Sequence, residues 1–394
     1  MKIWPTVIAV CGWFTAVNPG AAQIWTPTDS PATNWTSIAS SADGNKLVAL
    51  AGAPSGLIYT STNSGMTWTS NSMPNINWSC VASSADGNKL VAAAGYPDSG
   101  SVYTSDDSGK TWKSNNVPNS YWNSVASSAD GTKLTAAAGW VSGMGQIYTS
   151  TNSGAVWTLN SVPSNYWHYI VSSADGTKLA AMVNFGGNNG PIYTSPNSGS
   201  TWTTNFAPLP SYTSWGSLVS SADGTKLVAV AVYLIFTSTD SGATWKTNSV
   251  PDRIWLHGAS SADGGRLVLV AYDGAIYSST NSGTTWISNS APNTIWCNVA
   301  SSADGSKLAA VSYAGIYTSK SIPAPLLNLA FSRTNLTVSW IVPSTNFVLQ
   351  QNSDLTSMNW VVVTNPPVLN LTNLQNQVVL RSSNTSNVYR LKAP

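Results

Sequence analysis

A four-residue motif, Ser-Ala-Asp-Gly, recurs seven times in this 394-residue chain. Successive copies stand 40 to 48 residues apart. Self-similarity with a period of about 40–50 residues is typical of arrays in which each repeat is one small unit that packs on its neighbours. Most of the chain must therefore fold as a repeated architecture. The aspartates of the seven motifs are Asp43, Asp86, Asp130, Asp175, Asp223, Asp263 and Asp304.

Each repeat divides into four short strands separated by turn residues. In the second repeat, the expected strands cover residues 78–84, 89–94, 101–105 and 110–115. β-branched and aromatic residues fill these segments, while Gly, Asn and Asp fill the turns between them. Four strands per repeat make one blade of a propeller. The sequence therefore predicts an all-β fold, with a seven-bladed β-propeller over residues 23–320.

The seventh repeat lacks a fourth strand, because Pro-rich sequence begins soon after Ser319. A matching strand occurs at the other end of the array, over residues 23–26. Its Trp25 precedes Trp35 by ten residues, which is the spacing of the corresponding tryptophans in five of the other six repeats. We expect this N-terminal strand to complete the last blade and close the ring, which hides edges that could pair between molecules.

The first 22 residues have the features of a secretory signal peptide. Lys2 precedes an apolar stretch over residues 3–17, and small residues stand just before Gln23. We expect cleavage after Ala22 and delivery to the periplasm, the cell surface or the medium, where disulfides are stable. No later segment approaches the ~20 apolar residues that span a bilayer, so we expect no membrane insertion after cleavage.

The composition of the chain changes after residue 320. Residues 321–325 form a Pro-rich linker, and short alternating runs over residues 326–394 predict about six strands. This segment resembles the small, roughly fibronectin-like β-sandwich modules that end many secreted bacterial proteins. No function follows from that resemblance.

Six repeats carry a second motif, Ser-x-Asn/Asp-x-Gly-x-x-Trp, at the start of the fourth strand. It resembles the Asp-box, or bacterial neuraminidase repeat, of sialidases, sortilin-type propellers, family-74 glycoside hydrolases and photosystem II assembly-factor propellers. Four copies carry Asn where those families prefer Asp. Because Asn and Asp share a side-chain oxygen but not a charge, we interpret this position as a structural turn clamp. The clamp residues are Asn63, Asp107, Asn152, Asn197, Asp240 and Asn281.

The composition argues against the catalytic mechanism of sialidases, which the resemblance to the Asp-box would suggest. Sialidases as a family use an arginine triad, a Tyr nucleophile activated by a Glu, and an Asp acid/base. This chain contains no Glu, and its propeller repeats hold only Arg253 and Arg266. A family-74 type of hydrolase uses paired aspartates instead. Asp98 and Asp273 lie in loops between second and third strands and leave that alternative open.

The sequence gives no sign of a metal, a cofactor or nucleic acid. His168 and His257 lie in non-adjacent repeats, and we interpret them as ordinary strand residues because a metal site needs three or four converging ligands. Cys80 and Cys297 also lie in non-adjacent repeats, which predicts free thiols. No phosphate-binding Gly loop, zinc pattern or calcium loop occurs. A net charge of +2 gives no reason to expect nucleic acid as a partner.

Two sets of aromatic residues are candidates for ligand binding. The loops between second and third strands are long in repeats one to four, and they hold Tyr96, Trp140, Phe185 and Asn188. Such side chains suit stacking and hydrogen bonding to a glycan or an extended peptide. The second set consists of the tryptophans that begin the first strands, for which we favour packing between blades over ligand contact. Those of the long-loop repeats are Trp35, Trp78, Trp122 and Trp167.

These observations predict a monomeric, non-catalytic scaffold that binds a glycan or protein ligand through its variable loops, without catalytic residues. The alternative is a secreted glycoside hydrolase that uses aspartates. A role in assembly, by analogy with the photosystem propellers, would call for a charged docking patch, which the sequence lacks.

Overall fold

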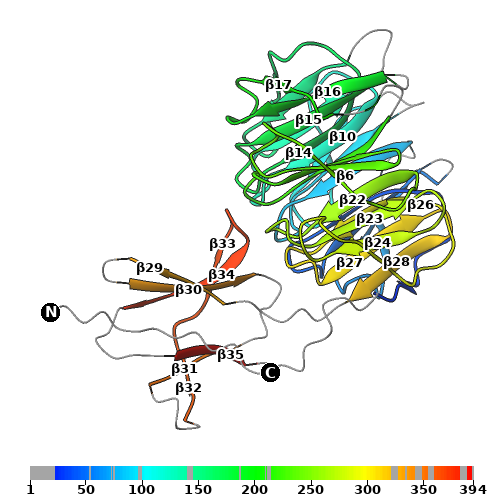
Figure 1. Ribbon diagram of the computed structural model, residues 1–394. Helices are drawn as coiled ribbons and strands as arrows, with labels where there is room; N and C mark the ends of the chain where they lie inside the picture. Colours follow the sequence, from blue (N-terminus) through cyan, green and yellow to red (C-terminus); the bar gives the residue numbers. More distant parts are fainter. Residues whose placement is uncertain are drawn as a thin grey trace.

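The computed structural model describes residues 23–392 except 53–54, 72, 74–75, 96–99, 140–144, 186–187, 209, 211–213, 321–326, 333–334, 342–347, 354–358 and 382–387. The expected signal peptide and linker lie outside these described residues. The elements of the described part are β-strands (Figure 1). Nothing in that part is a helix with the length and apolar character to cross a membrane.

Seven four-stranded antiparallel sheets form the blades of a propeller, as the sequence predicts. In each of the first six blades the strands follow one another in chain order. Blades 1 to 3 contain β2 (Trp35–Ser40), β3 (Leu47–Ala51), β4 (Ile58–Ser61), β5 (Thr69–Asn71); β6 (Trp78–Ser83), β7 (Leu90–Ala94), β8 (Val102–Ser105), β9 (Lys113–Ser114); and β10 (Trp122–Ser127), β11 (Leu134–Ala138), β12 (Ile147–Ser150), β13 (Thr158–Leu159).

Blades 4 to 6 repeat the same order. Their strands are β14 (Trp167–Ser172), β15 (Leu179–Phe185), β16 (Asn188–Ser195), β17 (Thr203–Asn205); β18 (Trp215–Ser220), β19 (Leu227–Ala231), β20 (Leu234–Ser238), β21 (Lys246–Asn248); and β22 (Trp255–Ser260), β23 (Leu267–Ala271), β24 (Ile276–Ser279), β25 (Ile287–Ser288). The expected bounds of the second repeat agree with the structure to within one residue at each end of the first three strands, whereas its fourth strand is much shorter.

The seventh blade combines both ends of the propeller segment. It contains β26 (Trp296–Ser301), β27 (Lys307–Ser312), β28 (Gly315–Lys320) and, as its outer strand, β1 (Thr26–Pro27). Thr26 pairs with Thr318, so the predicted strand over residues 23–26 is placed too early in the chain. The preceding residues pair elsewhere, because the Ser290 amide donates to the Gln23 carbonyl, at 3.1 Å.

A ring of seven backbone hydrogen bonds joins the blades through the Ser-Ala-Asp-Gly turns. In each turn the alanine amide donates to the alanine carbonyl of the next blade, at 2.6–2.8 Å. The last bond, from Ala303 to Ala42, crosses the seam between blades 7 and 1. The motif thus repeats because each copy makes the same contact with its neighbour. The ring runs through Ala42, Ala85, Ala129, Ala174, Ala222, Ala262 and Ala303.

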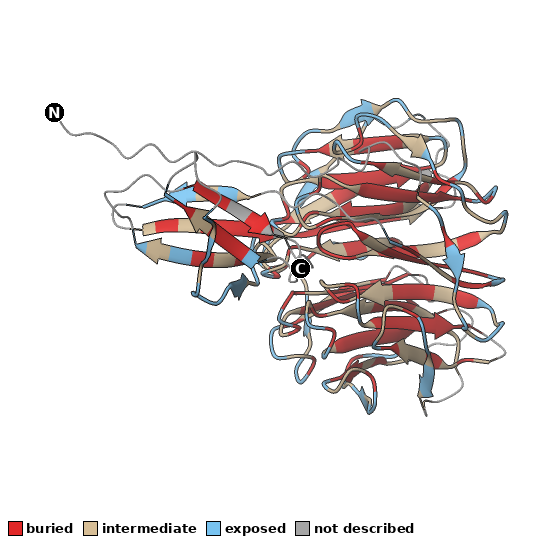
Figure 2. Cartoon of the chain, turned by 90° about the horizontal axis from the view of Figure 1, so that it is seen from below, coloured by how far each residue is buried: buried red, intermediate tan, exposed pale blue. Residues whose placement is uncertain are grey.

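The hydrophobic core lies between adjacent blades. Trp78, which begins blade 2, is fully buried against Leu50 and Ile58 of blade 1, and its indole N–H donates to the Gly56 carbonyl at 2.8 Å. The second strands of blades 1 to 3 are buried along their whole length because each lies between two blades. Figure 2 shows buried residues on the propeller strands and exposed residues mainly on the loops. All seven tryptophans that begin first strands are at most 3% exposed. They are Trp35, Trp78, Trp122, Trp167, Trp215, Trp255 and Trp296.

The clamp residues hold the turns before the fourth strands. Asn63 Oδ1 accepts from the Thr67 amide at 2.9 Å, and Asp107 Oδ1 accepts from the Thr111 amide at the same distance. The Asn63 amide donates to the Thr67 hydroxyl, whereas the Thr111 hydroxyl donates to Asp107. An amide and a carboxylate therefore fit the same turn, which agrees with a structural role that needs no charge.

The C-terminal segment contains two further sheets, as expected for a β-sandwich-like module. Residues of both sheets share one core, which includes Trp340 and Leu349. One sheet has the order β29-β30-β34-β33 and the other β32-β31-β35. The seven strands of this part are β29 (Asn328–Phe331), β30 (Asn335–Ile341), β31 (Val348–Asn352), β32 (Val361–Val362), β33 (Val368–Asn370), β34 (Gln375–Arg381) and β35 (Val388–Lys392).

Candidate functional site

Each blade begins its first strand with the same local irregularity. The pairing register of the first and second strands shifts between the tryptophan and the second residue after it, as in Trp78 to Cys80. Such a bulge bends the strand and changes the direction in which nearby side chains point. In blade 2 the intervening Ser79 hydroxyl donates to the Trp122 carbonyl of blade 3, at 2.6 Å. The bulge thus lets Ser79 hydrogen-bond to the next blade, while the following residue, Cys80, lies on the propeller axis.

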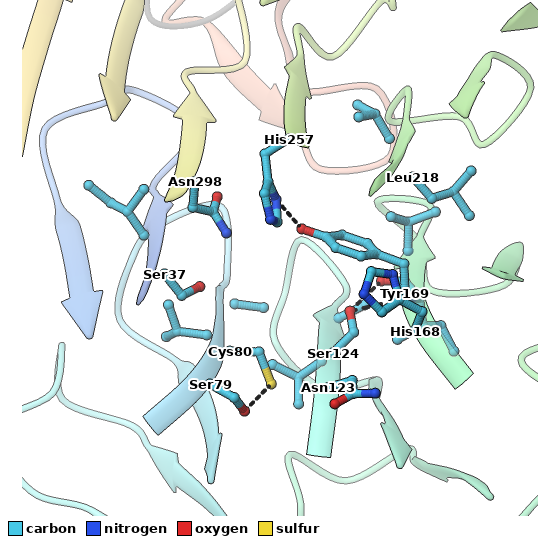
Figure 3. Close-up of a pocket in the computed structure, with 18 of the residues that line it drawn as sticks. Ser37, Ser79, Cys80, Asn123, Ser124, His168, Tyr169, Leu218, His257 and Asn298 are labelled. Atoms are coloured by element: carbon cyan, nitrogen blue, oxygen red, sulfur yellow. Dashed lines mark hydrogen bonds between the residues drawn. The ribbon is translucent and has the colours of Figure 1, made fainter. Parts of the chain in front are cut away.

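A cavity of about 420 Å³ lies on the propeller axis and is lined by the first strands of all seven blades. Six of its lining residues stand two positions after the tryptophan of their blade, and Figure 3 shows them around the cavity. We call these six residues the channel belt. The channel belt consists of Ser37, Cys80, Ser124, Tyr169, His257 and Asn298.

A tyrosine–histidine pair crosses the channel belt. The Tyr169 hydroxyl lies 2.7 Å from His257 Nδ1, although the two residues belong to blades 4 and 6 (Figure 3). Burial, followed by the charge of His168, lowers the pKa of His257 to about 3. Burial also raises the pKa of Tyr169 above its ordinary value. Both rings are therefore neutral near pH 7.

The remaining reactive groups of the cavity are neutral as well. Burial raises the pKa of the Cys80 thiol to about 12, so it is not a thiolate nucleophile at neutral pH. Burial lowers the pKa of His168, which lines the cavity beside Tyr169. The described lining residues include no Asp, Lys or Arg. The cavity therefore offers uncharged hydrogen-bonding groups rather than an acid–base pair.

His168 and His257 lie on the first strands β14 and β22, which agrees with their interpretation as strand residues. The sequence did not predict that they line one cavity. The first strands of all blades surround one axis, so side chains of non-adjacent blades meet across the channel. Among the described residues, no three His, Cys or Asp side chains are grouped to hold a metal ion. Cys80 and Cys297 are free thiols, as the sequence predicts.

A second group of side chains, which the sequence analysis missed, lies on three short loops. The β19–β20, β23–β24 and β27–β28 loops each carry one tyrosine that is 50–57% exposed. We call Tyr233, Tyr272 and Tyr313 the tyrosine rim. Each rim tyrosine follows a second strand whose last residue pairs with the tryptophan that begins the first strand, as Ser312 pairs with Trp296. The rim is therefore on the face where the first strands begin. The Tyr one or two residues after the second strand in the last three repeats is the signal that could have found it.

Backbone hydrogen bonds hold two of the rim tyrosines, Tyr233 to the chain that enters the next blade and Tyr272 to the chain that enters its own blade. Tyr233 has a φ of 67°, a left-handed conformation that a bulky residue rarely adopts. Its amide donates to the Arg253 carbonyl at 3.0 Å, and the Tyr272 amide donates to the Ile254 carbonyl at 2.9 Å. These bonds fix the positions of two rim tyrosines on rigid hairpins. Strained residues of this kind are often found at binding sites.

An ion pair stands beside the tyrosine rim. Arg253 pairs with Asp273, and the Arg253 guanidinium lies 6.0 Å from the centre of the Tyr277 ring. The hydrogen bond that Arg253 donates to Asp273 is the main cause that raises the pKa of Arg253. Asp273 is one of the two acids considered for hydrolysis, and here its carboxylate is engaged by an arginine. The other, Asp98, lies outside the described residues.

The structure separates the predicted ligand-binding residues into three groups. Tyr96 and Trp140 lie outside the described residues. Phe185 and Asn188 pair with each other at the end of the β15–β16 hairpin, so the long loop expected at 184–191 is mostly extended strand. The tryptophans are buried between blades and offer no surface to a ligand, which corrects their inclusion in the candidate set. This correction applies to Trp35, Trp78, Trp122 and Trp167.

Comparisons with known proteins identify the fold and no family. No protein-family model matches the sequence, and neither does any curated protein. Among solved structures, YCF48 from Cyanidioschyzon merolae is similar with a TM-score of 0.59 at 13% identity, over 76% of this chain and 98% of that protein. A second structure, YCF48 bound to D1 peptide, has a TM-score of 0.58 at 12% identity, over 80% and 100% of the two chains.

An enzyme has the same architecture. The GH74 xyloglucanase from Xanthomonas campestris has a TM-score of 0.58 at 14% identity, over 81% of this chain and 59% of the enzyme. The chain therefore spans little more than half of that enzyme. At such low identity these likenesses show the fold alone, which is that of a β-propeller.

Proposed function

We propose that this protein is an exported, monomeric, non-catalytic scaffold that holds a glycan or protein ligand on the face of the propeller where the first strands begin. The observation that carries the proposal is the tyrosine rim. Three large aromatic side chains are exposed on the hairpins between the second and third strands of three consecutive blades. Exposed tyrosines supply a wide apolar surface together with a hydroxyl, which suits contact with sugars and peptides.

The described chemistry of this face supports binding rather than catalysis. The groups of the axial cavity are neutral near pH 7, and Asp273 is paired with Arg253. The solved structures include one propeller bound to a peptide and one hydrolase. The peptide complex supports a protein ligand for this chain. The long loops of blades 1 to 4 belong to the same face in our proposal and would extend the contact surface.

The proposal is tested with protein that begins at Gln23, applied to an array of neutral glycans, acidic glycans and extended peptides. A ligand from the array is then titrated into Tyr272→Ala, Tyr313→Ala and the double variant. We expect each single change to weaken binding about 5–10-fold, which corresponds to about 1–1.4 kcal/mol for a lost aromatic contact. Phe206→Ala is the matched control, because Phe206 is 75% exposed and follows β17 at the outer edge of blade 4.

Two outcomes would overturn the proposal. Binding that is unchanged in the double variant would place the ligand on another surface, such as the C-terminal module. Hydrolysis of a sialoside or β-glucan above background, lost in Asp98→Ala or Asp273→Ala, would make the protein a glycoside hydrolase instead.

A further inference from the structure

We propose that the axial cavity is a separate binding site for a small, neutral, polyhydroxylated molecule of the size of a monosaccharide. This inference goes beyond the proposed function, because the tyrosine rim could hold its ligand while the cavity contained only water. It is carried by the charge, the hydrogen-bonding groups and the size of the cavity.

The absence of charge among the described lining residues selects against ionic ligands. A carboxylate or phosphate placed in the cavity would lose water without gaining a cationic partner there. The histidines do not supply a positive charge, because burial keeps the pKa of His257 far below neutral. The same argument excludes a cationic ligand, because no Asp lines the described cavity.

The hydrogen-bonding groups of the cavity select against a purely apolar ligand. Tyr169, His257 and Asn298 bring a hydroxyl, an imidazole and an amide to the channel belt, which can both donate and accept. The Tyr169–His257 bond uses only part of this capacity. An apolar molecule would displace water from the remaining donors and acceptors, at a cost of about 1–3 kcal/mol for each one left unpaired. Hydroxyl groups on a ligand can serve as donor or acceptor at every such position.

The cavity has a suitable size for such a ligand. Small-molecule pockets commonly have volumes of about 300–1,000 Å³, and this one has about 420 Å³. The wall of the cavity consists of first strands, and the turns that follow these strands are hydrogen-bonded in a closed ring. The cavity is therefore formed before the ligand arrives. A preformed wall reduces the ordering cost of binding.

The test is a titration of the chain that begins at Gln23 with glucose, galactose, mannose and xylose. Binding is measured by ligand-detected NMR and calorimetry. Glucuronate is the charged counterpart of glucose. We expect at least one neutral sugar to bind and glucuronate to bind at least 10-fold more weakly than glucose, a difference of about 1.4 kcal/mol. Tyr169→Phe, which keeps the ring, and Asn298→Ala should each weaken sugar binding about 5–10-fold through one lost hydrogen bond.

The control variants separate this site from the tyrosine rim. Tyr103→Phe removes a hydroxyl from a half-buried tyrosine on β8, outside the cavity lining, and should leave sugar binding unchanged. Tyr272→Ala should also leave it unchanged, while it weakens the array ligand. Absence of binding by every neutral sugar at high millimolar concentration would overturn the inference. Equal binding of glucuronate, or full binding by the folded Tyr169→Phe and Asn298→Ala variants, would overturn it as well.

Discussion

We expect closure of the propeller to depend on Trp25, which directly precedes the closing strand β1 and packs between blades 6 and 7. Its indole is 4% exposed and packs against Val268 and Ile276 of blade 6 and against Trp296 of blade 7. The Trp25 and Trp296 ring centroids are 6.0 Å apart. Trp25→Ala would therefore leave a large cavity between blades 6 and 7 without changing the backbone pairing of β1.

The magnitude follows from the buried surface. A buried Trp side chain removes about 150–250 Å² from water, which at about 25 cal/mol per Å² is worth about 4–6 kcal/mol as an upper bound. Measured Trp→Ala costs in protein cores are about 3–5 kcal/mol. We expect a loss of about 3–5 kcal/mol, which is a large share of the about 5–15 kcal/mol that stabilises a typical protein.

The assay is denaturant unfolding of the chain that begins at Gln23, monitored by tryptophan fluorescence and circular dichroism. Ile24→Ala is the matched control, because Ile24 is the adjacent residue and is 71% exposed. The control should change the free energy of unfolding by less than about 0.5 kcal/mol. Deletion of residues 23–28 should in addition open the edge of β28 and cause association, measured by light scattering. Equal stability of Trp25→Ala and Ile24→Ala would refute the closure argument.

Three further predictions concern turns and protonation. Asp107→Asn should leave stability nearly unchanged, whereas Asp107→Ala should cost about 1 kcal/mol by leaving the Thr111 amide without its acceptor. Equal losses in thermal unfolding would indicate that the charge matters. Gly87→Ala should cost at least about 1–2 kcal/mol, because φ is +68° and a Cβ would lie 2.8 Å from Lys46 Cβ. An unchanged melting temperature would contradict this. The free energy of unfolding should fall by up to about 2 kcal/mol between pH 7 and pH 5, because His257 of the unfolded chain takes up a proton below about pH 6.5, whereas its pKa in the folded protein is about 3. An equally steep pH dependence in His257→Gln would exclude this cause.

The fold could be read from the sequence because each blade is built from local signals. Turn residues recur at fixed offsets, and the second strands are continuous apolar runs because neighbouring blades cover both faces. Asn63 and Asp107 accept the same backbone hydrogen bond in their turns, which agrees with a clamp that depends on geometry rather than charge. The register of the closing strand could not be read in this way, because residues 23–25 pair with Ser290 and the pairing with β28 begins only at Thr26.

The sequence by itself determined the number of blades, their order and the residues that hold each turn, since these depend on contacts within one repeat or with the next. Only the tertiary structure decided which side chains meet on the axis. Tyr169 and His257 are 88 residues apart, and they touch because a closed ring brings all seven first strands to one channel. The exposure of the rim tyrosines was likewise decided by the ring, because the short hairpins of blades 5 to 7 end on the face where the first strands begin. No local pattern encodes such long-range convergence, which is a property of the closed circle of blades.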